Sequence, residues 1–185
     1  MPNKVVRTPS ASNLVWLDLE MTGLDAQYDV ILQAAIVITD KELSPLESYG
    51  CVIWQPEPEL QKMTPFVRDM HDKNGLIERV RSSTLDLASA EKQLLERVAG
   101  WCNFGAVLCG NSVGHDKRFI DRYMPGLARY LGYRIVDVSS IKVLARAWYG
   151  ESAAYVKPQE GAHDAVVDIQ RSIDELKHYR KTLFK

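Results

Sequence analysis

The chain has 185 residues, which is enough for one α/β domain with a substantial core and too few for two comfortable ones. Hydrophobic residues make up 46% of it and charged residues 25%, so a disordered or fibrous chain is excluded. Its 23 basic residues nearly balance 24 acidic ones, and the formal net charge of -1 argues against a wide basic groove for a long polyanion. This charge is compatible with a short anionic substrate that a few side chains or metal ions hold.

The N-terminal segment is polar and contains Pro2 and Pro9, so residues 1–12 are expected to form a flexible tail before a single domain over 13–185. The longest nearly apolar stretch, 30–38, is too short to span a membrane. The three cysteines form no CxxC pair and indicate no disulfide framework. A cytoplasmic protein without a membrane segment is therefore expected.

Three segments rich in β-branched and aromatic residues open the domain. Residues 14–17 and 31–39 are predicted to be strands, with turn residues at 22–25 between them, and residues 47–54 are predicted to form a third strand. Three short strands in succession favour an antiparallel meander.

Helical periodicity begins after the third strand. Ser83 and Asp86 resemble a capping box before an apolar stripe that continues to Trp101. A buried strand over 106–109 and a helix from about 114 to the residue before Pro125 are expected to follow.

The remaining third of the chain is predicted to complete the sheet. Residues 135–138 form the last predicted strand, Ser139 or Ser140 is expected to cap a helix to about 148, and a final helix is expected over about 163–183. This order of elements, βββαβαβα, predicts an α/β fold in which α-helices flank a mixed β-sheet, as in the ribonuclease-H-like architecture.

Asp18 and Glu20 are the most informative residues. Side chains at positions i and i+2 of a strand share one face, so two carboxylates would lie together beside an apolar run. Two unpaired like charges there are costly, and a hard divalent cation offsets them with the oxygen ligands that it prefers. The alternative is that the strand ends at Leu17 and both acids are solvated, and this segment alone favours neither.

Three further residues are candidates for the same site, and each could instead be an ordinary structural or solvent-exposed residue. Asp116 falls in the first turn of a predicted helix, where acids are also common because of the helix dipole. His163 and Asp168 are five residues apart, about 140° on a helix, so they share a site only if His163 lies at or before the helix start. Otherwise they are an exposed histidine and a solvated acid.

Together, the four acids and His163 fit one two-metal catalytic site. The acids are Asp18, Glu20, Asp116 and Asp168. The acids would hold two Mg²⁺ about 3.5–4 Å apart, which activate water and stabilise the leaving oxygen of a phosphodiester. His163 would be the general base, because the pKa of histidine is near neutral. A P-loop does not compete with this interpretation, since Asn111 stands where that motif requires lysine.

Several motifs in the correct order resemble one known family. Segments 13–25, 110–119, 137–148 and 163–169 are similar to the motifs of bacterial oligoribonucleases, in the histidine-containing branch of the DEDD 3′→5′ exonuclease superfamily. The resemblance runs from about residue 13 to the C-terminus. It implies the ribonuclease-H-like exonuclease fold, two Mg²⁺ or Mn²⁺ per site, and release of nucleoside 5′-monophosphates from short RNAs, down to dinucleotides, by a homodimer.

The resemblance also implies residues that bind the substrate. Leu24 matches an apolar residue that wedges between two bases, and Phe66 stands where many relatives have tryptophan. Residues that match the cap over the substrate's 5′-phosphate are His71, Arg134 and Ser139. Tyr133 matches a tyrosine that the partner subunit supplies. Alternatively, Leu24 and Phe66 are plain core residues and Ser139 is a helix cap.

The chain departs from the family in a few places. Gln33 replaces an acid, Val143 replaces a glutamate, and the loop over 149–160 differs in length and sequence. None of these is a proposed metal ligand. A different class of function, a non-catalytic RNA-end or nucleotide-binding module on the same fold, is disfavoured because all four acids and His163 are present.

Overall fold

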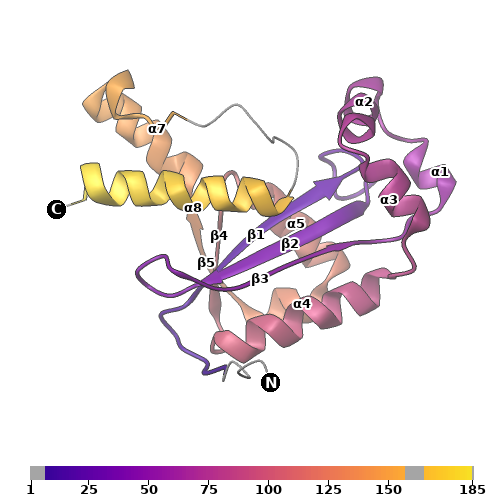
Figure 1. Cartoon of the computed structure of the whole chain (residues 1–185), viewed down its shortest axis with the longest axis horizontal. Helices are drawn as coiled ribbons and strands as arrows, with labels where there is room; N and C mark the ends of the chain where they lie inside the picture. Colours follow the sequence, from indigo (N-terminus) through magenta and orange to yellow (C-terminus); the bar gives the residue numbers. More distant parts are fainter. Residues whose placement is uncertain (1–6, 157–164, 185) are drawn as a thin grey trace, which may run out of the picture.

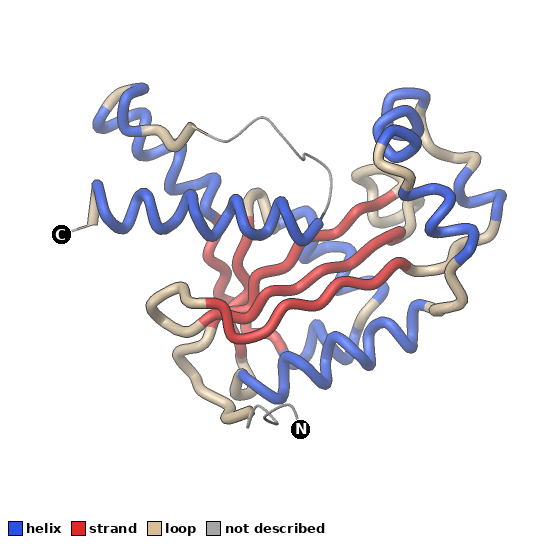
Figure 2. Tube along the Cα trace, viewed as in Figure 1, coloured by secondary structure: helices blue, strands red, loops and turns tan. Residues whose placement is uncertain are grey.

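The computed structural model describes residues 7–156 and 165–184, in which one sheet lies between two layers of helices (Figures 1 and 2). The five-stranded sheet has the order β3-β2-β1-β4-β5. Its strands are β1 (Leu14–Met21), β2 (Ile31–Thr39), β3 (Pro45–Val52), β4 (Ala106–Gly110) and β5 (Leu131–Asp137). β1 pairs antiparallel with β2 and parallel with β4, so the sheet is mixed, as predicted.

Helices cover the two faces unequally. One face packs against α4 (Leu87–Trp101), α5 (Gly114–Tyr123) and α6 (Pro125–Tyr130). The other face packs against α7 (Val138–Tyr149) and α8 (Ala165–Thr182), with a 3₁₀ turn over Glu151–Ala153 after α7.

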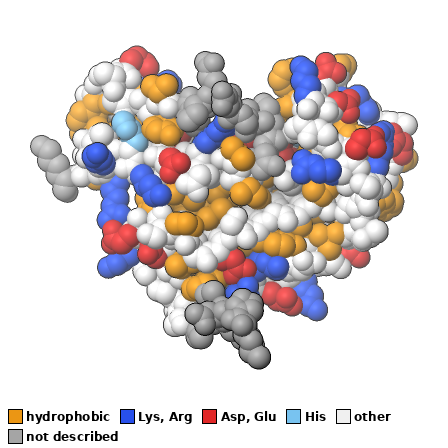
Figure 3. All heavy atoms as spheres, viewed as in Figure 1, with side chains coloured by type: hydrophobic (Ala, Val, Ile, Leu, Met, Phe, Trp, Pro, Cys, Tyr) orange, Lys and Arg blue, Asp and Glu red, His pale blue; other side chains and the backbone are white. Residues whose placement is uncertain are grey.

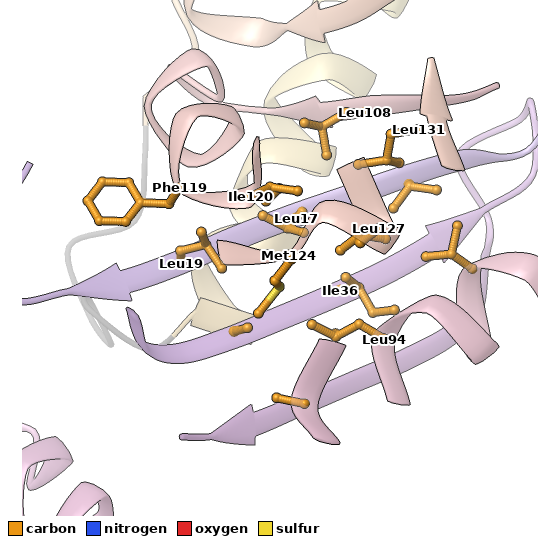
Figure 4. Close-up of a cluster of buried hydrophobic side chains, with 14 of the residues drawn as sticks. Leu17, Leu19, Ile36, Leu94, Leu108, Phe119, Ile120, Met124, Leu127 and Leu131 are labelled. Carbon is orange, nitrogen blue, oxygen red and sulfur yellow. The ribbon is translucent and has the colours of Figure 1, made fainter. Parts of the chain in front are cut away.

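The alternation of side chains along β1 separates the two cores. Leu17 and Leu19 are buried with residues of α4, α5 and α6, in the cluster that Figure 4 shows. Trp16 is buried with residues of α7 and α8. Because successive strand side chains point to opposite faces, Asp18 and Glu20 are on the α8 face with Trp16.

Three short helices were not predicted. They are α1 (Glu57–Leu60), α2 (Pro65–Lys73) and α3 (Leu76–Ser82), and they form a small core of their own against Leu32 of β2. Helices of four to nine residues span too few turns to produce a clear apolar period, so this missing prediction has a simple cause. They lie near the carboxyl end of β1 (Figure 1).

Two predicted helix caps were wrong. Asp86 itself is the N-cap of α4 and accepts a hydrogen bond from Ser89 N, while Ser83 ends α3. Asp137 caps α7 by accepting from Ser139 N, and β5 begins at Leu131, four residues before the predicted start. In both cases a carboxylate, a stronger acceptor than a hydroxyl, satisfies an amide of the first turn.

Part of the segment expected to be a flexible tail is hydrogen-bonded to the domain. Ser10 N donates to Trp101 O at 2.9 Å, and Asn13 Nδ2 donates to the same oxygen at 2.7 Å. Ser10 therefore joins the end of this segment to the C-terminal end of α4. Within the described residues, no helix combines the length and the apolar character needed to cross a membrane.

Candidate active site

Three carboxylates meet where α8 crosses β1. β1 continues to Met21, so the alternative in which the strand ends at Leu17 is wrong, and Asp18 and Glu20 share one face of the strand. Asp168 lies in the first turn of α8 and completes the group. One ligand oxygen from each of the three residues lies within 4.8 Å of the other two.

This donor set fits a divalent cation. All three groups offer hard carboxylate oxygens, which Mg²⁺ and Mn²⁺ prefer, and their mutual repulsion favours a bound positive charge. Glu20 is buried, Asp18 is half-buried, and Asp168 retains some contact with solvent. Arg171 Nη1 lies 2.9 Å from Asp168 Oδ1, so a cation of α8 already orients this carboxylate.

Asp116 is anchored beside this group by the backbone of β1. It lies in the first turn of α5, is 7% exposed, and its Oδ1 accepts a hydrogen bond from Leu19 N at 3.0 Å. The β1–β4 pairing ends at Trp16 opposite Cys109, which leaves space between the strands for this side chain. Burial raises the pKa of Asp116 to about 7, against the opposing effect of the Leu19 hydrogen bond.

The raised pKa of Asp116 predicts a pH-dependent stability without divalent ions. Between about pH 4 and 7 the folded state holds a proton that the unfolded state has released, so stability falls as pH rises, by at most about 1.4 kcal/mol per pH unit. Urea unfolding in a chelator measures this slope. Asp116→Asn keeps an acceptor for Leu19 N and is expected to lose the slope; parallel pH profiles for the two proteins would contradict the assignment.

His71 lies beside Glu20 in the interior of the protein. Its side chain is fully buried in α2, with Nε2 3.0 Å from Met21 O and Nδ1 3.9 Å from Glu20 Oε2. Because a carbonyl oxygen only accepts, Nε2 carries the proton. His71 therefore lies beside Glu20, and its expected place in the cap over the 5′-phosphate stays a prediction.

Ser139 belongs to a polar network at the carboxyl ends of β4 and β5. Its hydroxyl donates to Asn111 Oδ1 and lies 3.1 Å from Ser112 Oγ. The Asp137 carboxylate accepts from both Ser112 N and Ser139 N. Ser112 was not singled out from the sequence, although its place directly after a buried strand, in a loop at the sheet edge, was a usable signal.

The other residues expected to bind substrate lie on the surface. Leu24 is 67% exposed and Phe66 is 78% exposed, so their alternative assignment as core residues is wrong. Leu24 lines a pocket of about 630 Å³ with Lys62 and Arg118 among its other walls. The face in Figure 3 shows basic and acidic side chains interspersed, without a continuous basic band.

Tyr133 and Arg134 project from β5. Tyr133 is 80% exposed, and the Arg134 guanidinium carbon lies 4.5 Å from the centre of its ring. A Cβ on Gly132 would be only 2.7 Å from Gly105 O, so glycine is required where β5 starts beside β4. His163, the expected general base, lies outside the described residues.

Comparison with known proteins identifies the family. Residues 15–176 match a family described as "Exonuclease". The chain is 48% identical to the oligoribonuclease of Colwellia psychrerythraea over 177 residues, which cover 94% of this chain and 97% of that protein. It is 44% identical to that of Vibrio parahaemolyticus over 95% of this chain and 98% of the relative. The chain belongs to the oligoribonuclease family. This confirms the resemblance drawn from the motifs and the prediction that the protein is a nuclease.

Solved structures confirm the ribonuclease-H-like exonuclease fold. Exonuclease I from Methylocaldum szegediense superimposes with a TM-score of 0.70 at 19% identity, over 94% of this chain and 41% of that one. The metal-free complex of Escherichia coli exonuclease I with single-stranded DNA gives a TM-score of 0.71 at 16% identity, covering 93% of this chain and 40% of that one. The oligoribonuclease-family chain thus spans about two fifths of these larger exonucleases.

Proposed function

We propose that this oligoribonuclease-family chain is a 3′→5′ exoribonuclease that degrades short RNAs, down to dinucleotides, to nucleoside 5′-monophosphates. The observation that carries the proposal is the meeting of Asp18, Glu20 and Asp168 within 4.8 Å, with Asp116 anchored beside them. The family relation supports the same activity.

The four acids would hold two Mg²⁺ or Mn²⁺. Such a pair supplies an activated water and charge stabilisation for the leaving oxygen of a phosphodiester. The protein supplies the positions: β1 fixes Asp18 and Glu20 on one face, Arg171 orients Asp168, and Leu19 N orients Asp116. His163 would take the proton from the attacking water, because its resemblance to the family's histidine assigns it that role.

The surface residues would restrict the substrate to short lengths. Leu24 and Phe66 are exposed apolar side chains that can contact unstacked bases, and stacking of this kind does not require a particular sequence. Ser139, with Ser112 beside it, and Arg134 would supply donors to a terminal phosphate once their present hydrogen bonds rearrange. The small net charge provides no electrostatic track for a longer strand.

We also propose that the protein acts as a homodimer. α7 and the end of α8 expose an apolar surface that no element of the described chain covers, including a hollow of about 220 Å³. Its exposed members are Leu144, Trp148, Tyr149 and Phe184. Contiguous apolar surface of this kind is typical of protein interfaces. In such a dimer Tyr133 would reach the substrate of the partner.

A length series of RNA substrates tests the proposed activity. End-labelled RNAs of two, five, ten and thirty nucleotides in Mg²⁺ are expected to lose nucleoside 5′-monophosphates from the 3′ end, with kcat/KM highest for the shortest. Affinity is expected to depend only weakly on salt, because few phosphates are bound. Processive degradation of the thirty-nucleotide RNA in preference to the dinucleotide would contradict the proposal. Tight binding without turnover would identify a non-catalytic RNA-end-binding module instead.

A further inference from the structure

A buried glutamine adjoins the group of three carboxylates. Gln33 lies on β2, is 4% exposed, and its backbone stands directly opposite Glu20 in the β1–β2 register. Side chains of directly opposite residues in an antiparallel pair have Cβ atoms about 4.5–5.5 Å apart and lie on the same face. The Gln33 side chain is therefore next to that of Glu20.

The face that Gln33 occupies is the face of the carboxylates. Ala35 and Val37 lie two and four residues after Gln33, so they are on the same face of β2. They pack in the core beneath α7 and α8, whereas Ile36 packs beneath α4. The pairing of Asp18 with Ala35 and of Glu20 with Gln33 places all four residues on the α8 side of the sheet. Gln33 thus extends the site from β1 onto β2.

The carboxamide oxygen of Gln33 has no hydrogen-bond partner in the described part of the chain, although the atom is buried. A buried acceptor without a donor lowers the stability of the fold, and such atoms are uncommon in native proteins. The adjacent Glu20 carboxylate, when ionised, carries no proton to offer. Within residues 7–156 and 165–184 no group supplies this donor, so Gln33 Oε1 can accept one from a bound water.

We propose that Gln33 is a positioning residue of the metal centre, whose Oε1 accepts a hydrogen bond from a water that enters with a hydrated divalent ion. Mg²⁺ gives up its waters reluctantly and keeps several when it binds to a protein, and each water is a donor. Hydrogen-bond partners around metal ligands commonly change metal affinity by about 10- to 100-fold when they are removed. The inference rests on the proposed function, because it needs a divalent ion at the three carboxylates.

Removal of the acceptor has two opposite consequences that a purely structural residue would not produce. Gln33→Met keeps an unbranched side chain of similar length, so it removes the buried acceptor with little change in packing. Without divalent ions this variant is expected to unfold at the same temperature as the wild type or higher. With Mn²⁺ its affinity is expected to fall by about 10- to 100-fold, and the metal-induced rise in Tm is expected to shrink.

Two other substitutions control the experiment. Gln33→Glu retains an acceptor and is expected to bind Mn²⁺ at least as tightly as the wild type. In a chelator it is expected to unfold at a lower temperature, because it adds a negative charge beside Glu20. Thr39→Val changes a buried polar residue on the same face of β2, where Thr39 Oγ1 accepts from Trp16 Nε1 at 3.1 Å. It is expected to lower Tm without changing the metal-induced rise.

Thermal unfolding and calorimetric titration with Mn²⁺ alone, on the full chain, decide between the outcomes. If the wild type binds Mn²⁺ and Gln33→Met binds it equally well, the proposed role of Gln33 is wrong, whereas the proposed metal centre is supported. If the wild type neither binds Mn²⁺ nor gains stability from it, the proposed metal centre itself is wrong. Gln33→Leu repeats the measurement if Gln33→Met does not fold.

Discussion

Asp18→Asn is expected to abolish RNA hydrolysis in Mg²⁺ and to leave the fold intact. The substitution removes one of three negative charges whose oxygens lie within 4.8 Å of one another, and an amide contributes no charge to balance a dication. The remaining acids, Glu20, Asp116 and Asp168, are expected to bind divalent ions more weakly. Without metal, the variant is expected to be at least as stable as the wild type, because carboxylate repulsion is relieved.

The measurement combines turnover of a dinucleotide with chemical unfolding. Asp174→Asn is a matched control, because this substitution makes the same change of charge away from the three carboxylates. Asp174 lies on α8 and pairs with Lys177 at the surface. The control is expected to retain wild-type turnover. Unaltered hydrolysis by Asp18→Asn at the same Mg²⁺ concentration would remove Asp18 from the site.

Tyr133→Ala is expected to stay folded and dimeric but to lose most of its activity. The ring is 80% exposed on β5, so its removal costs little packing within the subunit. The proposed homodimer instead places this ring against the substrate of the partner, so that each active site is built from two chains. Sedimentation and circular dichroism check the assembly and the fold.

Mixing two inactive variants tests this geometry. In a heterodimer of Tyr133→Ala with Asp18→Asn, the Tyr133→Ala chain keeps its own carboxylates and receives an intact tyrosine from its neighbour. One of the two sites is then complete, and activity is expected to return when subunits exchange. If heterodimers form and no activity returns, Tyr133 acts in its own subunit or outside catalysis.

The parts of the fold that sequence reasoning predicted depend on local regularity. The apolar stripe of α4 and the alternation along β1 repeat over enough residues to identify both the elements and their buried faces. The spacing of Asp18 and Glu20 followed from the same alternation. The resemblance of segment 163–169 to the family's last motif then supported the assignment of Asp168 to the same site.

The parts that were missed depend on contacts between distant segments. The hydrogen bond from Leu19 N to Asp116 joins residues 97 positions apart, and His71 is buried against Glu20 because α2 folds over the end of β1. No local pattern reports either contact. The position of Gln33 opposite Glu20 requires the strand register, which single-sequence patterns leave open.

Cleavage of an RNA dinucleotide in Mg²⁺ and in a chelator is the most direct test of the site as a metal-dependent exonuclease. With Mg²⁺, the wild type is expected to release the 3′-terminal residue as a nucleoside 5′-monophosphate, which mass spectrometry identifies. In the chelator, the dinucleotide is expected to remain intact. Release of a nucleoside 3′-phosphate, or equal cleavage in the chelator, would contradict the assignment of Asp18, Glu20, Asp116 and Asp168 to a catalytic metal centre.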